Sequence, residues 1–318
     1  MSVFTPLEQQ DIQQFLQGFE VGPLLHFEGI EGGSENTNYF VTCRNAAGAT
    51  TDYVLTLVER GPVQDLPFFV ELLQCLQGDG LPVPYAIRDR HGAGLHTLRG
   101  KPALLQPRLA GEHPDTTTTM QCEALGSFLG RMHRIRCNLK RDADRGPQWI
   151  IEHARRMLRC CWQADATWLT PLLADLQGWL DTQPNLPTCI IHGDLFRDNA
   201  LFQGDELTGV IDFYNAATSW RVLDLAVCAN DWCIAIDDDG SISLDERRLQ
   251  ALVEGYQTHT QLTAAEVAAI PRILQLAALR FWVSRQQYAL QHRDQPSVLI
   301  KDPEYFRQVL RLHSESSL

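Results

Sequence analysis

Residues 188–213 read Thr188-Cys189-Ile190-Ile191-His192-Gly193-Asp194-Leu195-Phe196-Arg197-Asp198-Asn199-Ala200-Leu201-Phe202-Gln203-Gly204-Asp205-Glu206-Leu207-Thr208-Gly209-Val210-Ile211-Asp212-Phe213. Short apolar runs at 188–191, 200–202 and 208–211 predict three strands, and Gly-Asp at 204–205 predicts the turn between the last two. Residues 192–199, which carry the polar side chains of this stretch, therefore occupy a loop between strands, and Asp212 follows the third strand. This arrangement places several side chains that could take part in catalysis at the ends of strands.

The spacing of these polar residues is specific. A His-x-Asp is followed five residues later by Asn199, and an Ile-Asp-Phe comes thirteen residues after that asparagine. Together they form the catalytic signature of the kinase fold. In phosphoryl transfer one carboxylate orients the attacking hydroxyl, while an asparagine and a second carboxylate hold magnesium. We assign these roles to Asp194, Asn199 and Asp212, and expect His192 to hold the loop by hydrogen bonding.

Composition limits the other possibilities. With 318 residues and 44 % hydrophobic residues, the chain is long and apolar enough for two folded lobes. A net charge of −12 argues against a nucleic-acid or anionic-membrane surface. The N-terminus has no secretory-signal pattern, no apolar run is long enough for a membrane span, and we expect a cytoplasmic protein. The nine cysteines are odd in number and form no Cys-x-x-Cys pair, which favours free thiols.

Hydrophobic periodicity divides the chain into two parts. Up to about residue 105, strands dominate, with helices expected over 6–18 and 65–77. Beyond that, helices dominate, and we expect them over 122–134, 149–161, 168–181, 222–236, 245–260, 264–269 and 272–291. The fold class is therefore α+β, a two-lobed kinase-like fold. Residues 1–105 would form a small β-rich nucleotide-binding lobe, and residues 106–318 a larger, mainly helical lobe for catalysis and substrate binding.

A glycine-rich turn lies between two strands predicted within residues 27–41. Gly32, Gly33 and Ser34 can bring backbone N–H groups close to phosphates, and Asn38 follows on the second strand. A glycine pair alone is usually a hairpin turn, but the downstream signature favours a phosphate contact. We therefore assign these residues to ATP binding. The chain contains no P-loop motif.

The kinase template also expects a lysine on the third strand. Here that position falls at Thr56, and Lys101 is the first lysine of the chain. Glu71, at the place of the template's helix glutamate, then has no lysine to pair with. Magnesium, backbone donors or an arginine such as Arg60 would have to supply the missing charge.

Departures from the protein-kinase pattern point to a particular family. His-Gly-Asp replaces His-Arg-Asp, the Asp-Phe-Tyr at 212–214 lacks the final glycine, and no Ala-Pro-Glu follows. In this the chain resembles the aminoglycoside-phosphotransferase and choline-kinase group. Within that group it resembles the homoserine kinases from about residue 26 to residue 312. The stretches that carry this resemblance lie at 36–41, 53–57, 81–84, 191–196, 230–233, 279–282 and 301–303.

This resemblance implies ATP- and Mg²⁺-dependent phosphorylation of the homoserine side-chain hydroxyl, in threonine biosynthesis. It also makes Thr56 a departure shared with the family. A zwitterionic amino acid needs an anionic partner for its ammonium and a cationic one for its carboxylate. Asp231 and Arg280 lie in apolar stretches where an unpaired charge is costly, so we expect them to bind the substrate, with Trp232 and Trp282 as walls.

Other functions stay open at this point. A related kinase could act on an aminoglycoside, choline or a sugar, although Arg280 in the site would argue against the first two. A pseudokinase would explain the missing lysine but not the intact Asp194, Asn199 and Asp212. A metal-dependent hydrolase lacks a second His/Asp cluster at ligand spacing. The sequence does not indicate the oligomeric state.

Overall fold

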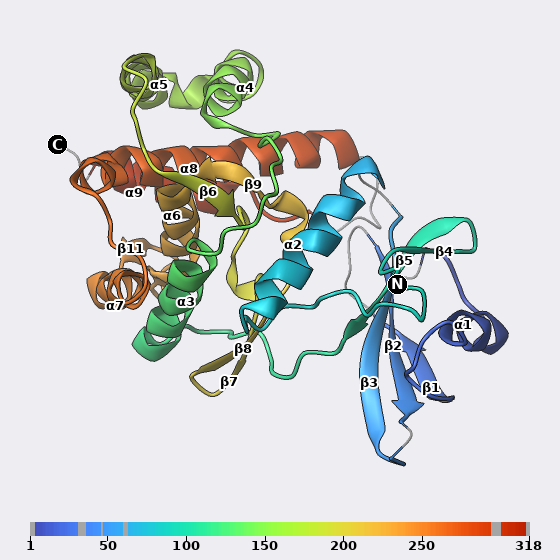
Figure 1. Ribbon diagram of the computed structural model, residues 1–318. Coiled ribbons are helices and arrows are strands. Elements are labelled where there is room, and N and C mark those ends of the chain that lie inside the picture. Colours follow the sequence, from blue (N-terminus) through green and yellow to red (C-terminus); the bar gives the residue numbers. More distant parts are fainter. Residues whose placement is uncertain (1–3, 31–35, 46, 60–62, 294–299, 316–318) are drawn as a thin grey trace. The chain divides into compact units, whose positions relative to one another are not determined.

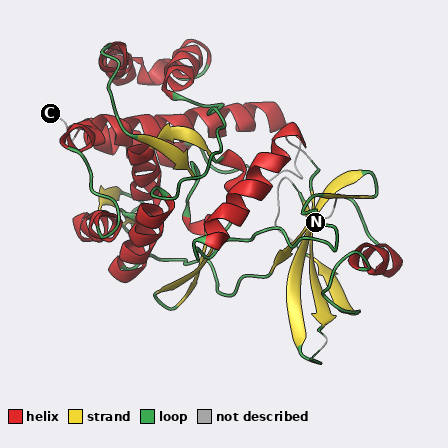
Figure 2. Ribbon diagram, in the orientation of Figure 1, coloured by secondary structure: helices red, strands yellow, loops and turns green. Residues whose placement is uncertain are grey.

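The computed structural model describes residues 4–30, 36–45, 47–59, 63–293 and 300–315. It consists of two compact units (Figures 1 and 2). Unit 1 comprises residues 1–111 together with 137–139 and 208–211. Unit 2 comprises residues 112–136, 140–207 and 212–318. The main division falls at residue 111 rather than the predicted 105, and two short later segments return to unit 1.

Unit 1 is built on a five-stranded antiparallel sheet with strand order β1-β2-β3-β5-β4. Its elements are α1 (Gln9–Leu16), β1 (Leu24–Gly29), β2 (Thr37–Arg44), β3 (Thr50–Leu57), the 3₁₀ turn Val63–Asp65, α2 (Leu66–Gly78), β4 (His96–Leu98) and β5 (Lys101–Pro107).

The two faces of this sheet differ because side chains alternate along each strand. On one face, Val41, Leu55 and Leu105 are fully buried in a core that includes Ile12 of α1. On the other face, Leu104 packs with Val70 of α2. The expected strand-rich architecture with helices near 6–18 and 65–77 is confirmed.

Unit 2 is mainly helical (Figure 2). Its helices are α3 (Thr119–Met132), α4 (Pro147–Cys160), α5 (Ala166–Asp181), α6 (Arg221–Trp232), α7 (Glu246–Gln257), α8 (Ala264–His292) and α9 (Glu304–Glu315), with 3₁₀ turns at Gln163–Asp165, Arg197–Asn199 and Phe213–Asn215. Its short strands are β6 (Thr188–Ile191), β7 (Ala200–Gln203), β9 (Ala217–Trp220), β10 (Ile234–Ile236) and β11 (Ile242–Leu244), while β8 (Glu206–Val210) leads back toward unit 1.

Two expectations for the helices were wrong. We split residues 264–291 at Pro271, but α8 continues through it, because Pro271 lies on the exposed side of the helix while Ala269 before it and Ile273 after it are buried. We also extended one helix to residue 236, whereas α6 ends at Trp232. The β-branched residues that follow form β10, which pairs with β11 around a turn containing Gly240 in a left-handed conformation.

The α8 helix is the core of unit 2. It packs against α4, α6 and α9, and residues 276–283 are almost entirely buried (Figure 1). By length and composition alone the helix could cross a membrane, but two thirds of its most apolar part lies inside the unit. Its apolar character is therefore explained by core packing.

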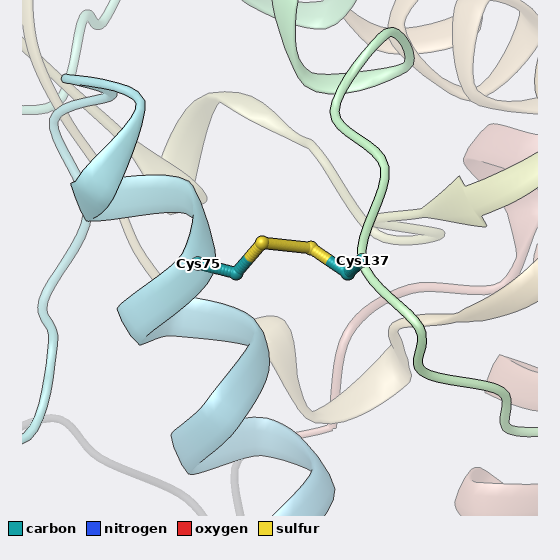
Figure 3. Close-up of a disulfide and its surroundings, with 2 residues drawn as sticks. All are labelled: Cys75 and Cys137. Atoms are coloured by element: carbon teal, nitrogen blue, oxygen red, sulfur yellow. A yellow bond between two sulfur atoms is a disulfide. The ribbon is translucent and has the colours of Figure 1, made fainter.

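A disulfide links Cys75 to Cys137, against our expectation of free thiols throughout (Figure 3). Cys75 lies on α2, and Cys137 belongs to the short segment 137–139 that joins unit 1. The two Cα atoms are 6.6 Å apart, although 62 positions separate them in sequence. Only tertiary folding brings the pair together, so neither spacing nor the odd cysteine number could indicate it. The other seven cysteines are free.

Candidate active site

The catalytic loop, residues 192–199, connects β6 to β7 within unit 2. β6 is held in place by antiparallel pairing with β9. From the end of β6 the backbone turns at Gly193, whose φ is +77°. A Cβ atom at this residue would lie 3.0 Å from the carbonyl oxygen of Asn215. The glycine of His-Gly-Asp is thus required by backbone conformation and by close packing.

Asp224 of α6 fixes the loop from inside the unit. This fully buried carboxylate accepts hydrogen bonds from the backbone N–H groups of His192 and Gly193, both at 2.7 Å. It also contacts His133 Nε2 at 3.1 Å. Burial raises the pKa of Asp224, but the His133 and backbone contacts outweigh it and lower the pKa below its ordinary value. Asp224 therefore braces the catalytic loop.

Asp194, the candidate base, is half-buried at the centre of the loop. Asn215 Nδ2 donates to its Oδ2 atom at 3.2 Å, and Asn199 Nδ2 donates to its backbone carbonyl at 2.8 Å. Burial and the neighbouring negative charge of Asp212 raise the pKa of Asp194 to about 7, although Arg280 opposes the shift. A carboxylate with such a pKa can accept a proton near neutral pH.

The structure also locates the two candidate magnesium ligands. Asn199 is buried, and Asp212 is exposed just after the third strand of the signature, in a left-handed conformation with φ +62°. Among the described residues, no group of three His, Cys, Asp or Glu side chains could hold a metal by itself. One amide and one carboxylate nevertheless suit Mg²⁺, which usually binds one or two protein ligands and completes its shell with substrate phosphates and water.

His192 is fully buried and supports the loop. Its Nδ1 atom accepts a hydrogen bond from the backbone N–H of Asp194 at 3.2 Å, and its ring packs against Phe213. These contacts indicate that His192 positions the catalytic loop.

Arg280 of α8 reaches the same loop. Its Nη1 atom donates to the carbonyl oxygen of Gly193 at 2.7 Å, and the side chain is 94 % buried. In protein kinases an arginine occupies the position of Gly193; here a guanidinium from a distant helix contacts that backbone instead. The apolar sequence around Arg280 and the needs of a zwitterionic substrate predicted it as a functional residue, but they did not predict this contact.

The other three predicted substrate residues have structural partners. Asp231 accepts a hydrogen bond from the backbone N–H of Arg197 at 2.8 Å and forms an ion pair with its guanidinium. Trp232 is fully buried and donates from Nε1 to the carbonyl of Leu195. Trp282 stacks on Trp162 with ring centroids 3.6 Å apart. These contacts account for all three residues without a ligand.

Sequence reasoning missed Lys301, whose ammonium pairs with Asp198 of the catalytic loop. It acts on Asp194 as well, because its positive charge lowers the pKa of that carboxyl. The only signal was the family-like stretch 301–303.

In unit 1, Asn38 of β2 lies next to Thr56 of β3, at the position of the missing lysine. Thr56 Oγ1 donates to Asn38 Oδ1 at 2.7 Å, on the sheet face opposite the α1 core. Lys101 pairs with Glu59, which also accepts a 2.6 Å hydrogen bond from Thr37 Oγ1. Gly32, Gly33, Ser34 and Arg60 lie outside the described residues.

Comparisons with known proteins identify the family of the chain. The model of the "Phosphotransferase enzyme family" matches residues 26–264. A curated homoserine kinase of Pseudomonas aeruginosa is 46 % identical over 96 % of this chain and 94 % of its own length, and one of Methylobacillus flagellatus is 38 % identical over 98 % and 95 %. A solved spectinomycin phosphotransferase in complex with ADP and spectinomycin superposes with a TM-score of 0.72 at 13 % identity, covering 98 % of this chain and 99 % of its own. The last likeness concerns the fold alone.

Proposed function

Because the chain belongs to the phosphotransferase enzyme family and, within it, to the homoserine kinases, we infer that it phosphorylates the side-chain hydroxyl of L-homoserine with ATP. The product is O-phospho-L-homoserine, an intermediate of threonine biosynthesis. One observation carries this conclusion: a homoserine kinase is 46 % identical over nearly the full length of the chain.

The residues of the catalytic loop account for the chemistry. The Asp194 carboxylate accepts the proton of the substrate hydroxyl as its oxygen bonds to the γ-phosphorus. The bond between the γ-phosphorus and the bridging oxygen breaks, and ADP leaves. His192 and Asp224 hold the loop so that the carboxylate is correctly placed before substrate arrives.

We propose that Mg²⁺ accompanies ATP and that Asn199 and Asp212 would hold it. When bound, the ion neutralises phosphate charge. In unit 1, we propose that the face carrying Asn38 and Thr56, with the glycine-rich segment 32–34, contacts the nucleotide. Thr56 would offer a hydroxyl where protein kinases have lysine. We also propose that the protein is cytoplasmic, because ATP and amino-acid intermediates are available there.

The direct test is coupled ADP release from purified protein with Mg-ATP, comparing homoserine, serine, choline, kanamycin and no acceptor. Turnover with homoserine alone is the expected result. Preferential turnover of another acceptor would keep the phosphotransferase chemistry and reject the substrate. Nucleotide binding without any turnover would make the chain a pseudokinase.

A further inference from the structure

A small cavity lies within unit 2 beside the catalytic loop. Its volume is about 120 Å³, and it is lined by Arg141, Ala143, Asp144, Arg145, Ile191, Asn215, Ala217, Ser219, Leu223 and Arg280. Asn215 links the cavity to catalysis, since the same side chain donates a hydrogen bond to Asp194. The cavity therefore lies one side chain away from the candidate base.

The charges around this cavity are unbalanced. Three arginines and a single carboxylate line it, in a chain whose net charge is −12. The one carboxylate, Asp144, forms an ion pair with Arg141 at 2.6 Å. Arg141 also donates a hydrogen bond to the carbonyl of Ala216. Arg145 and Arg280 remain without a carboxylate partner among the described residues.

Of the two arginines, Arg280 has the greater need for an additional hydrogen-bond acceptor or anion. Among the described residues, its Nη1 atom donates to the Gly193 carbonyl, and its buried Nε atom has no hydrogen-bond acceptor. Burial lowers the pKa of this guanidinium; Asp194 and Asp224 oppose the effect, while Arg145 adds to it. The two cations are thus close enough to repel each other. The nearby carboxylates form no direct ion pair with this buried cation, which leaves part of its desolvation cost, and a bound anion would reduce that cost.

We propose that this cavity binds the α-carboxylate of the amino-acid acceptor through Arg145 and Arg280, which places the hydroxyl at the other end of the molecule toward Asp194. The proposal rests on homoserine as the substrate. The cavity suits a carboxylate and the first carbons of an amino acid, because pockets for drug-sized ligands are roughly 300–1,000 Å³. Its positive charge also selects against the polycationic aminoglycosides.

The test compares homoserine with 3-aminopropan-1-ol, which is homoserine without its carboxylate. In Arg145→Gln, kcat/KM for homoserine should fall about 10- to 100-fold, the loss of a charge-assisted contact, with most of the change in KM. For 3-aminopropan-1-ol the variant should match the wild type. If that alcohol turns over too slowly, its inhibition constant against homoserine provides the same comparison.

Two further variants sharpen the result. Arg272→Gln is the matched control, because Arg272 is a partly exposed arginine of the same helix as Arg280 and pairs with Asp175 instead. Arg145→Lys should recover part of the lost homoserine activity by restoring the charge. Melting curves of each variant report whether it is folded.

Equal losses with both acceptors would overturn the proposal, since they would mean that Arg145 acts on the transferred phosphoryl group or on the fold. An unchanged KM for homoserine would also overturn it. Failure of the proposed function looks different: the wild-type protein itself would not turn over homoserine.

Discussion

At the scale of single residues, Asp194 meets two requirements of a general base. It must be ionised at the working pH, and it must still hold a proton well enough to take one from an alcohol. Burial and Asp212 raise its pKa to about 7, while Arg280 and Lys301 limit the shift. The sequence motif predicts the identity of this base, but the charges that adjust it come from α8 and from the segment before α9.

Replacing Asp194 with asparagine should remove the base and keep its shape. We expect turnover to fall by about 10²- to 10⁴-fold, while ATP still binds. In the wild type, kcat/KM should rise with pH through about 7, because the carboxyl loses its proton there, and the variant should lack this rise. Steady-state rates from pH 5.5 to 8.5 and titration with a fluorescent ATP analogue measure both effects. Near-normal turnover of the variant would reject Asp194 as the base.

Thr56 permits a test of the nucleotide-binding face. Thr56→Val keeps the size of the side chain but removes the hydroxyl that donates to Asn38. We expect KM for ATP to rise about 3- to 10-fold, consistent with one lost hydrogen bond, and KM for homoserine to stay unchanged. Thr50→Val, at the exposed start of the same strand, is the control. An unchanged KM for ATP would mean that this pair serves only the sheet.

At the scale of elements, the catalytic loop owes its shape to α6. Asp224 uses both carboxylate oxygens to accept backbone N–H groups, so an amide at this position would turn an NH₂ group toward a donor. We expect Asp224→Asn to lower the free energy of unfolding by about 3 kcal/mol, the cost of breaking a buried charged contact, and to lower kcat.

Chemical denaturation and steady-state kinetics measure the two effects of Asp224→Asn. Asp175→Asn, which changes an exposed carboxylate of α5, should leave both quantities unchanged. A variant that unfolds more easily but keeps the full kcat would show that Asp224 stabilises the unit without positioning the loop.

Elements differ in how well sequence predicts them. Local sequence patterns predicted the catalytic loop and its flanking strands. Phosphoryl transfer constrains the spacing of the catalytic residues, and the strands are short apolar runs. The continuity of α8 through Pro271 depends on which side of the helix faces solvent, and the partner of Asp231 depends on where the catalytic loop passes. A charge within an apolar stretch gave Arg280 a functional interpretation, whereas Trp232 and Trp282, predicted as walls of the same site, are buried in the core.

At the scale of the whole molecule, the disulfide is unexpected for a protein that we propose to be cytoplasmic. A cytoplasmic enzyme normally keeps its thiols reduced. In the structure, Cys75 and Cys137 are joined, and seven cysteines remain free. Closing a loop of 62 residues restricts the unfolded chain, which by the loop-entropy relation stabilises the fold by about 4 kcal/mol.

The last prediction concerns the redox state of this pair. Alkylation of the unfolded, unreduced protein should label seven thiols, and labelling after reduction should reach nine, as mass spectrometry would show. Cys75→Ser should lower the free energy of unfolding by about 4 kcal/mol in oxidised protein, and the reduced wild type should show the same loss. Nine labelled thiols without reductant would mean that the pair is a dithiol in the protein as isolated. The stability of unit 1 would then come from its core and sheet alone, and Cys75→Ser would change it little.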